Sequence, residues 1–409
     1  MRTAAITRRG RRSTGGKAVA NRIWQFYGPR RIVFGPGCVE VVGREVKRLG
    51  GSRVLLVTDP GVRAAGIVER VLEFLEAEKL ESTIYEDVQS NPTVGNVSDG
   101  VSALRRHRAD AVVGVGGGSV LDAAKMVAAL AANGGQVQEY DGVDLVQKRM
   151  LPFVAVNTTA GTGSEVSRWA VITDPERQVK MAIGSENIVP DVAVDDPLLT
   201  TSIPQSLTAA TGMDALTHAI EAYVGKNASH LSDSLALGAI ALLTGNLRRA
   251  YSSGDDVEAR GKVLYGQMLA GLAFSNAGVG NVHAMAHQLG AVYDMPHGLA
   301  NAMLLPYVME FNLVGNEGRF ARIAEAMGEI VSDLSDRSAA RKACSNVVAL
   351  NKDLGIPAAL KDCGVKEGGL DVLVEKTMND GAMTTNPRQT SKAEMAGLWH
   401  RAFEGVLDL

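Results

Sequence analysis

The pattern of apolar and polar residues changes once along the chain, near residue 204. Before that point, short apolar runs alternate with segments whose apolar residues recur every three or four positions. The run that begins at Arg53 stops at Asp59-Pro60 and is followed by a helical pattern at residues 68–80; strand and helix patterns then alternate through residue 132. Because parallel neighbouring strands need helical crossovers, this half predicts an α/β domain with a parallel, doubly wound sheet.

After residue 204 the pattern is helical throughout. The spacing predicts helices at residues 205–224, 232–250, 255–274 and 320–334, with few β-branched runs between them. We therefore expect an α/β domain at residues 24–204 and an all-helical domain at residues 205–409.

The start of the chain is strongly basic. The first 39 residues hold nine Lys or Arg and no acidic residue. We expect residues 1–23 to be a disordered extension, with an organelle transit peptide as the alternative.

Composition narrows the function classes. The hydrophobic fraction of 46%, with 21% charged residues, is typical of a soluble globular protein. A net charge of -3 gives no basic field for a polyanion, so we expect a small-molecule substrate and no nucleic acid. The sequence contains no apolar stretch of about 18 residues, so we expect no membrane span.

The cysteines indicate the compartment. Cys38, Cys344 and Cys363 are dispersed and predict neither a disulfide framework nor a CxxC site. They therefore favour a reducing compartment, the cytoplasm.

A glycine-rich loop follows the apolar strand predicted at residues 112–115. It consists of Gly116, Gly117, Gly118 and Ser119, and a helical pattern follows directly. This order places backbone N–H groups and a positive helix end where a pyrophosphate can bind, and the glycines allow close approach. A glycine turn that serves only chain geometry is the alternative.

Two other strand ends carry polar residues suited to a nucleotide. The loop at residues 157–165 is rich in hydroxyl groups, including those of Thr158, Thr159 and Thr162, although a capped turn would have the same composition. Asp59 could accept both hydroxyls of an adenosine ribose and repel a 2′-phosphate, which favours NAD over NADP. The alternative is that Asp59 is a turn residue before Pro60.

Histidine is scarce and clustered. Three of the seven histidines, His283, His287 and His297, fall within 15 residues, and His218 lies four residues after Asp214 on an apolar helix pattern. Inward-pointing acids and imidazoles are costly unless they are paired or bind a cation. One carboxylate with imidazoles suits Fe(II), Zn(II) or another first-row divalent ion, whereas hydrogen-bonded core histidines are the alternative. The other histidines, His107, His230 and His400, are expected to be surface or packing residues.

Four motifs in this order resemble the iron-containing (group III) alcohol dehydrogenases. The motifs are GGGSVLDAAK, TTAGTGSE, GMDALTHAIEAYV and HAMAHQLGAVYDMPHGLANAMLLP, and the resemblance extends from about residue 24 to residue 409. It implies a dehydroquinate synthase-like fold with an α/β N-terminal domain and a helical C-terminal domain. It also implies NAD and a divalent metal, with Fe(II) preferred and Zn(II) as the alternative.

The resemblance also implies roles for individual residues. The metal ligands would be Asp214, His218, His283 and His297, and His287 would lie beside the nicotinamide as a catalytic proton relay. The cofactor contacts would be Asp59, Gly116, Gly117, Gly118, Ser119, Asp122, Thr158, Thr159, Thr162, Lys180 and His287.

The expected reaction is reversible hydride transfer between a small primary alcohol or diol and NAD. The alternatives are a dehydroquinate-synthase-like lyase, a reductase of a short hydroxyacid or sulfonated aldehyde, and a catalytically silent NAD-binding regulator. Residues 263–318 contain no Lys or Arg, which argues for a neutral or weakly charged substrate unless the other domain supplies a cation such as Arg168. We expect a homodimer or a larger homo-oligomer.

Overall fold

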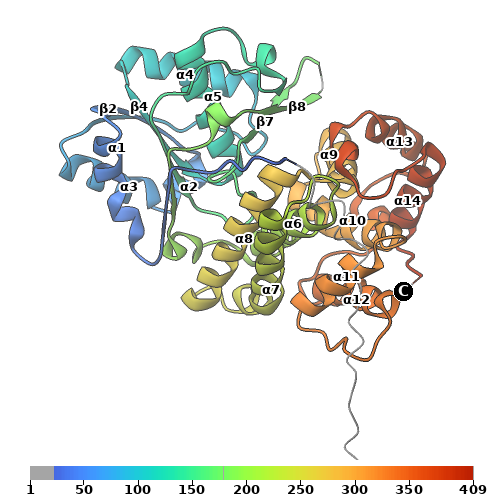
Figure 1. Cartoon of the computed structure of the whole chain (residues 1–409). Helices are drawn as coiled ribbons and strands as arrows, with labels where there is room; N and C mark the ends of the chain where they lie inside the picture. The colour runs from blue at the N-terminus through green and yellow to red at the C-terminus, as the bar shows by residue number, and fades with distance from the viewer. Residues whose placement is uncertain (1–22, 178, 409) are drawn as a thin grey trace, which may run out of the picture.

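The computed structural model describes residues 23–177 and 179–408. The predicted extension at residues 1–23 therefore lies outside the described residues, apart from Ile23. An α/β half, blue to green, lies beside a helical half, yellow to red (Figure 1). No helix in the described part of the chain is long and apolar enough to cross a membrane.

The α/β half is built on a six-stranded parallel sheet with the order β1-β9-β6-β4-β2-β3. The strands are β1 (Arg31–Phe34), β2 (Arg53–Val57), β3 (Glu81–Tyr85), β4 (Ala111–Gly116), β6 (Phe153–Asn157) and β9 (Val192–Asp195). The helices are α1 (Val42–Arg48), α2 (Pro60–Ala64), α3 (Ile67–Ala77), α4 (Val94–His107) and α5 (Gly118–Asn133). Strands β4 and β6 are buried along their whole length, as expected for parallel strands covered on both faces. The predicted fold class is confirmed.

A second, smaller sheet was not predicted. It has the order β5-β8-β7, in which β7 (Trp169–Asp174) and β8 (Val179–Gly184) pair antiparallel and β5 (Gly142–Val143) joins β8 in parallel. The turn between β7 and β8 starts at Asp174, whose Oδ1 accepts hydrogen bonds from the N–H groups of Glu176 and Arg177 at 3.1 Å. The two strands are therefore joined by a local turn and not by a helical crossover.

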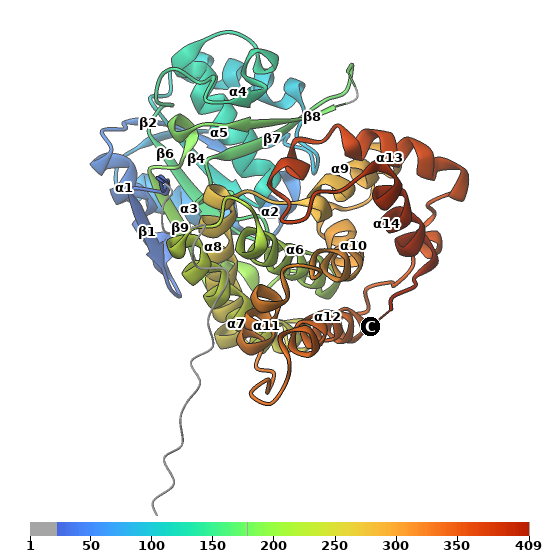
Figure 2. The same ribbon diagram turned by 45° about the vertical axis from the view of Figure 1, so that its right-hand side comes forward.

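The helical half contains the long helices that the spacing predicted. They are α6 (Gln205–Val224), α7 (His230–Ser252), α8 (Val257–Ala277), α9 (Asn281–Tyr293), α10 (His297–Asn312), α11 (Glu317–Ala326), α12 (Asp336–Asp353), α13 (Leu370–Met378) and α14 (Lys392–Glu404). The prediction of a helix through residue 334 was wrong, because α11 ends at Ala326 and Gly328 adopts a φ of 87°. In both views α6 and α8 lie nearer the sheet than α13 and α14 do (Figures 1 and 2).

A buried polar network joins the sheet to the helical half. Asn157, at the end of β6, donates through Nδ2 to Asp195 Oδ1 at 3.0 Å and to Gln267 Oε1 of α8 at 3.3 Å. Gln267 in turn donates to Glu165 Oε1 at 2.7 Å. Burial raises the pKa of Asp195 from its usual 3.8 to about 7, against the Asn157 hydrogen bond that lowers it, and burial and Asp195 raise that of Glu165. The network therefore fixes the two halves together at the carboxyl end of the sheet.

We expect the pKa of Asp195 to appear in the pH dependence of stability. The unfolded chain ionises this group near pH 3.8 and the folded protein near pH 7, so the free energy of unfolding should fall as pH rises through this window. The Asp195→Asn variant keeps the Oδ1 acceptor but cannot ionise. Its free energy of unfolding should therefore fall less between pH 4 and pH 8 than that of the unmodified protein, by on the order of 2 kcal/mol. Urea unfolding across this pH range, with chelator present, measures the difference. An equal fall in both proteins would contradict the assignment.

Candidate active site

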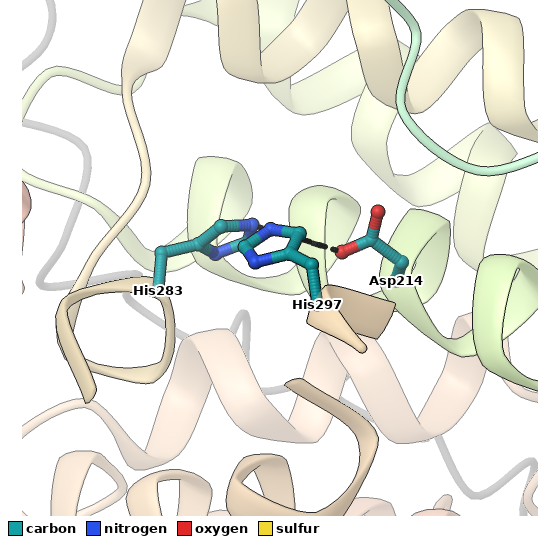
Figure 3. Close-up of side chains that lie close together, drawn as sticks. All are labelled: Asp214, His283 and His297. Atoms are coloured by element: carbon teal, nitrogen blue, oxygen red, sulfur yellow. Dashed lines mark ion pairs between the residues drawn. The ribbon is translucent and has the colours of Figure 1, made fainter. Parts of the chain in front are cut away.

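Three side chains from three helices of the helical half converge on one point. Asp214 lies on α6, His283 lies in the first turn of α9, and His297 is the first residue of α10. Their side-chain ligand atoms all lie within 4.8 Å of one another, and Figure 3 shows the two imidazoles beside the carboxylate. Helix α10 begins at His297, because Pro296 occupies its N-cap position. The structure thus brings together residues that are up to 83 positions apart in sequence.

The geometry of this cluster fits a divalent cation. The Oδ1 atom of Asp214 lies 3.9 Å from His283 Nε2 and 3.7 Å from His297 Nε2. Burial alone would raise the pKa of Asp214, but His218, His297 and His283 outweigh it and lower the pKa. Burial lowers the pKa of His283 well below its usual value. An ionised carboxylate beside a neutral imidazole is the donor set that such an ion requires.

His218 lies next to the cluster but outside the group of three. It is on the same face of α6 as Asp214, and its ring stacks on His283 with centroids 4.5 Å apart and on Phe274 at 4.2 Å. Its Nδ1 atom is buried and has no hydrogen-bond partner among the described residues. Such an unsatisfied nitrogen is costly in a protein interior, so its position is compatible with a fourth ligand.

His287 lies beside the cluster and is half-buried. Its ring stacks on His297 with centroids 5.6 Å apart, and its Nδ1 atom lies 2.9 Å from Asp380 Oδ2. The same carboxylate oxygen accepts from Gln288 Nε2 at 3.1 Å. The structure thus places His287 beside His283 and His297, with a carboxylate partner of its own.

Three residues of this site were missed by the sequence analysis. Asn301 Nδ2 lies 2.6 Å from Asp214 Oδ1, and Glu221 Oε2 lies 2.6 Å from His283 Nδ1. Helical spacing could have indicated both, since Glu221 is seven residues after Asp214 and Asn301 is four residues after His297. Asp380 follows α13 in a non-helical segment, and no sequence pattern points to it.

The glycine loop is shaped for close backbone approach. Helix α5 begins at Gly118, and no side chain caps its N-terminus. A Cβ atom at Gly118 would lie 2.5 Å from Thr162 Cγ2, and one at Gly117 would lie 3.0 Å from Thr159 Cγ2. The two predicted nucleotide loops therefore lie in contact with each other, with the uncapped N–H groups of α5 beside them. This arrangement fits a pyrophosphate.

Other predicted cofactor contacts have partners within the chain. Asp59 Oδ1 accepts from Val62 N at 2.9 Å, which makes Asp59 the N-cap of α2. Asp122 accepts from Ser164 Oγ at 2.6 Å and from Val171 N at 2.9 Å. Both carboxylates thus have structural roles, whatever else they bind.

The remaining contacts lie in or near the loops. Thr158 is buried, whereas Ser119 donates through Oγ to the carbonyl oxygen of Ser90. Lys180 donates from Nζ to Asn91 Oδ1 at 3.0 Å, and Asn91 donates to Asp294 Oδ1 at 3.2 Å. Burial lowers the pKa of Lys180, against the nearby charge of Asp294. These bonds link the small sheet to the end of α9.

Comparison with known proteins identifies relatives over almost the whole chain. The model of the iron-containing alcohol dehydrogenases matches residues 29–197, and that of the C-terminal part of the Fe-containing alcohol dehydrogenase family matches residues 208–403. The 1,3-propanediol dehydrogenase of Klebsiella pneumoniae is 45% identical over 93% of this chain and 99% of its own length. The NAD-dependent methanol dehydrogenase of Bacillus methanolicus is 42% identical over 91% of this chain and 97% of its own.

Solved structures show the same likeness in three dimensions. The crystal structure of 1,3-propanediol oxidoreductase superposes with a TM-score of 0.92 at 45% identity, covering 93% of this chain and all of that one. Both sequence and structure thus match over nearly the full length. The chain belongs to the iron-containing alcohol dehydrogenase family, and it is an oxidoreductase that interconverts alcohols and aldehydes.

Proposed function

We propose that this protein transfers a hydride reversibly between a small primary alcohol or diol and NAD, with Asp214, His218, His283 and His297 holding a divalent metal. Membership in the family implies NAD and a divalent metal, and we propose Fe(II) in preference to Zn(II). The observation that carries the proposal is the convergence of three ligand atoms within 4.8 Å. The orphaned Nδ1 atom of His218 supports the fourth ligand.

The two halves of the chain have different roles in this proposal. We propose a dinucleotide-binding domain at residues 24–204 and a metal and substrate domain at residues 205–409. This division is supported by the separate family models, which leave residues 198–207 between them. It also agrees with the position of the nucleotide loops in the α/β half and of the ligands in the helical half.

The residues of the site suit this chemistry. A divalent ion held by the ligands supplies a Lewis acid that acidifies an alcohol or polarises a carbonyl. The loop of Gly116, Gly117, Gly118 and Ser119 binds the pyrophosphate and so orients the nicotinamide, with Thr158, Thr159 and Thr162 beside it. The Asp380 carboxylate accepts from His287 Nδ1, which leaves Nε2 to pass a proton between substrate and solvent.

Relatives indicate the class of substrate. Besides the propanediol and methanol dehydrogenases, the lactaldehyde reductase of Escherichia coli is 38% identical over 90% of this chain and 97% of its own length, and these names all refer to short alcohols or aldehydes. A sulfoacetaldehyde reductase of Bifidobacterium kashiwanohense superposes with a TM-score of 0.85 at 28% identity, which keeps a short charged aldehyde as the second candidate. Arg168, which could serve such a substrate, pairs with Asp144 at 2.5 Å and lies over the ring of Tyr27. A neutral substrate is therefore favoured.

We also propose a cytoplasmic homodimer or larger homo-oligomer. The dispersed cysteines, which are free, support a reducing compartment. The oligomer is tested by light scattering at micromolar concentration.

The metal assignment predicts the effect of removing a ligand. His297→Ala should lower affinity for Zn(II) or Fe(II) by more than the about 10–100-fold typical of changes to residues that only support ligands. NADH-dependent aldehyde reduction should be lost, while NADH binding, followed by fluorescence, should stay near normal because the nucleotide loops lie in the other half. Near-normal turnover of metal-free His297→Ala would contradict the assignment.

His287→Gln provides the matched control from the same cluster. It should retain stoichiometric metal and bind NADH, and only turnover should fall, by about 10²-fold or more if His287 relays the proton. Loss of the metal would place His287 among the ligands, and an unchanged rate would leave it without a catalytic part.

Asp59 predicts the choice between NADH and NADPH. Asp59→Ser removes the carboxylate that would face a 2′-phosphate but keeps a side chain that can cap α2 through Val62 N. The ratio of kcat/KM for NADPH to that for NADH should rise about 10-fold or more, since 1.4 kcal/mol of relieved repulsion is a factor of ten. Steady-state assays with both cofactors measure it. Equal use of both cofactors by the unmodified protein would show that Asp59 only caps its helix.

A further inference from the structure

Glu221 is a buried carboxylate on α6 that belongs to no ligand set, yet both of its oxygens face the helix that carries His283. Its Oε2 atom lies 2.6 Å from His283 Nδ1, and its Oε1 atom accepts from Val282 N at 2.7 Å. Burial raises the pKa of this carboxyl to about 7, against the N–H group of Gly280, which lowers it. A Cβ atom at Gly280 would lie 3.0 Å from Oε1, so the glycine permits this close approach.

These contacts determine which nitrogen of His283 carries the proton. An ionised carboxylate only accepts hydrogen bonds, so a neutral His283 beside ionised Glu221 has its hydrogen on Nδ1 and a lone pair on Nε2. The Nε2 atom is the one that faces Asp214. The tautomer set by Glu221 is therefore the one that can bind a metal.

Asn301 gives an independent indication of the same tautomer. Its Nδ2 atom lies 2.6 Å from Asp214 Oδ1, and a carboxylate partner requires the amide nitrogen, not the oxygen, at this position. The same nitrogen lies 3.2 Å from His283 Nε2. It also lies 3.1 Å from His297 Nε2, so the second amide hydrogen points toward the pair of imidazoles, where it is favourable only if the nitrogen it meets carries no hydrogen.

Glu221 also fixes the position of the helix itself. The N-cap of α9, Gly280, offers no side chain to the free N–H groups of the first turn. Glu221 Oε1 accepts from Val282 N at 2.7 Å, and Asn386 Oδ1 accepts from Asn281 N at 3.2 Å. The carboxylate from α6 thus holds the turn of α9 on which His283 lies, at the positive end of the helix dipole.

We propose that Glu221 is a positioning residue of the metal site, which orients His283 and fixes its Nε2 lone pair toward Asp214. This proposal rests on the proposed function, in which His283 and Asp214 are metal ligands. It explains a buried acid whose side-chain hydrogen bonds, within the described part of the chain, are to Val282 N and His283 Nδ1.

Glu221→Gln tests the role with little change in volume. The amide nitrogen of Gln would face either His283 Nδ1–H or Val282 N–H, donor against donor, and it favours the tautomer with hydrogen on Nε2. The Kd for Zn(II), measured on metal-free protein by competition with a chromophoric chelator, should rise about 10–100-fold. The visible spectrum of the Co(II) protein should change as well. Glu221→Asp, which keeps the charge, should bind Zn(II) more tightly than Glu221→Gln.

Asp191→Asn is the matched control. Asp191 is also a buried carboxylate that accepts a backbone N–H, from Phe153 at 3.1 Å, together with Arg149 at 2.9 Å, but it lies at the opposite end of the sheet from the glycine loop. Its loss should lower stability and leave the Kd for Zn(II) unchanged. The comparison separates orientation of a ligand from general destabilisation.

The tautomer can also be read in the unmodified protein. Nitrogen-15 NMR of the metal-free protein, with the His283 signal assigned through His283→Gln, should show hydrogen on Nδ1. Hydrogen on Nε2, or an equal Kd for Zn(II) in folded Glu221→Gln, would overturn the role of Glu221 alone. An unmodified protein that binds no Zn(II), Co(II) or Fe(II) would instead overturn the proposed metal site and this proposal with it.

Discussion

The rest of the site depends on the burial of the Asp214 carboxylate among apolar helices. An ionised acid in such surroundings is stable only when cations or hydrogen-bond donors surround it. Here α6, α9 and α10 each direct polar side chains at this one point and are otherwise largely buried and apolar. A divalent ion is the partner that fits this site best. It could bind the Asp214 carboxylate and the unprotonated nitrogens of His283 and His297, beside the Nδ1 atom of His218 that has no hydrogen-bond partner among the described residues.

The second requirement is that the two halves keep a fixed relation. The loops after β4 and β6 lie at the carboxyl ends of parallel strands, which is where ligands bind in open α/β sheets. Asn157, Asp195 and Gln267 join these strand ends to α8, and Lys180 reaches from the small sheet toward the end of α9 through Asn91. A nucleotide bound in one half and a metal bound in the other can therefore face the same substrate.

Much of this arrangement could be predicted from sequence, because it rests on short-range patterns. The apolar spacing predicted a helix at residues 205–224, and α6 has these bounds. The strand predicted at residues 112–115 is β4, which extends one residue further at each end. Scarcity and spacing of histidine indicated the metal cluster. Glu221 was missed because a single acid in a helical pattern is usually solvent-exposed, although its position seven residues after Asp214 places it on the same face of α6. The hairpin of β7 and β8 could have been predicted as well, because Asp174-Pro175 is a local turn signal, but this signal was not used.

The central claim is that this chain binds a divalent ion through one carboxylate and imidazoles from the helical half, without thiolates. X-ray absorption spectroscopy of the Zn(II)-reconstituted protein tests it most directly. The account predicts only oxygen and nitrogen scatterers near 2.0–2.2 Å, with the outer-shell pattern of about three imidazoles. A sulfur scatterer near 2.3 Å, or a spectrum without imidazole, would contradict it.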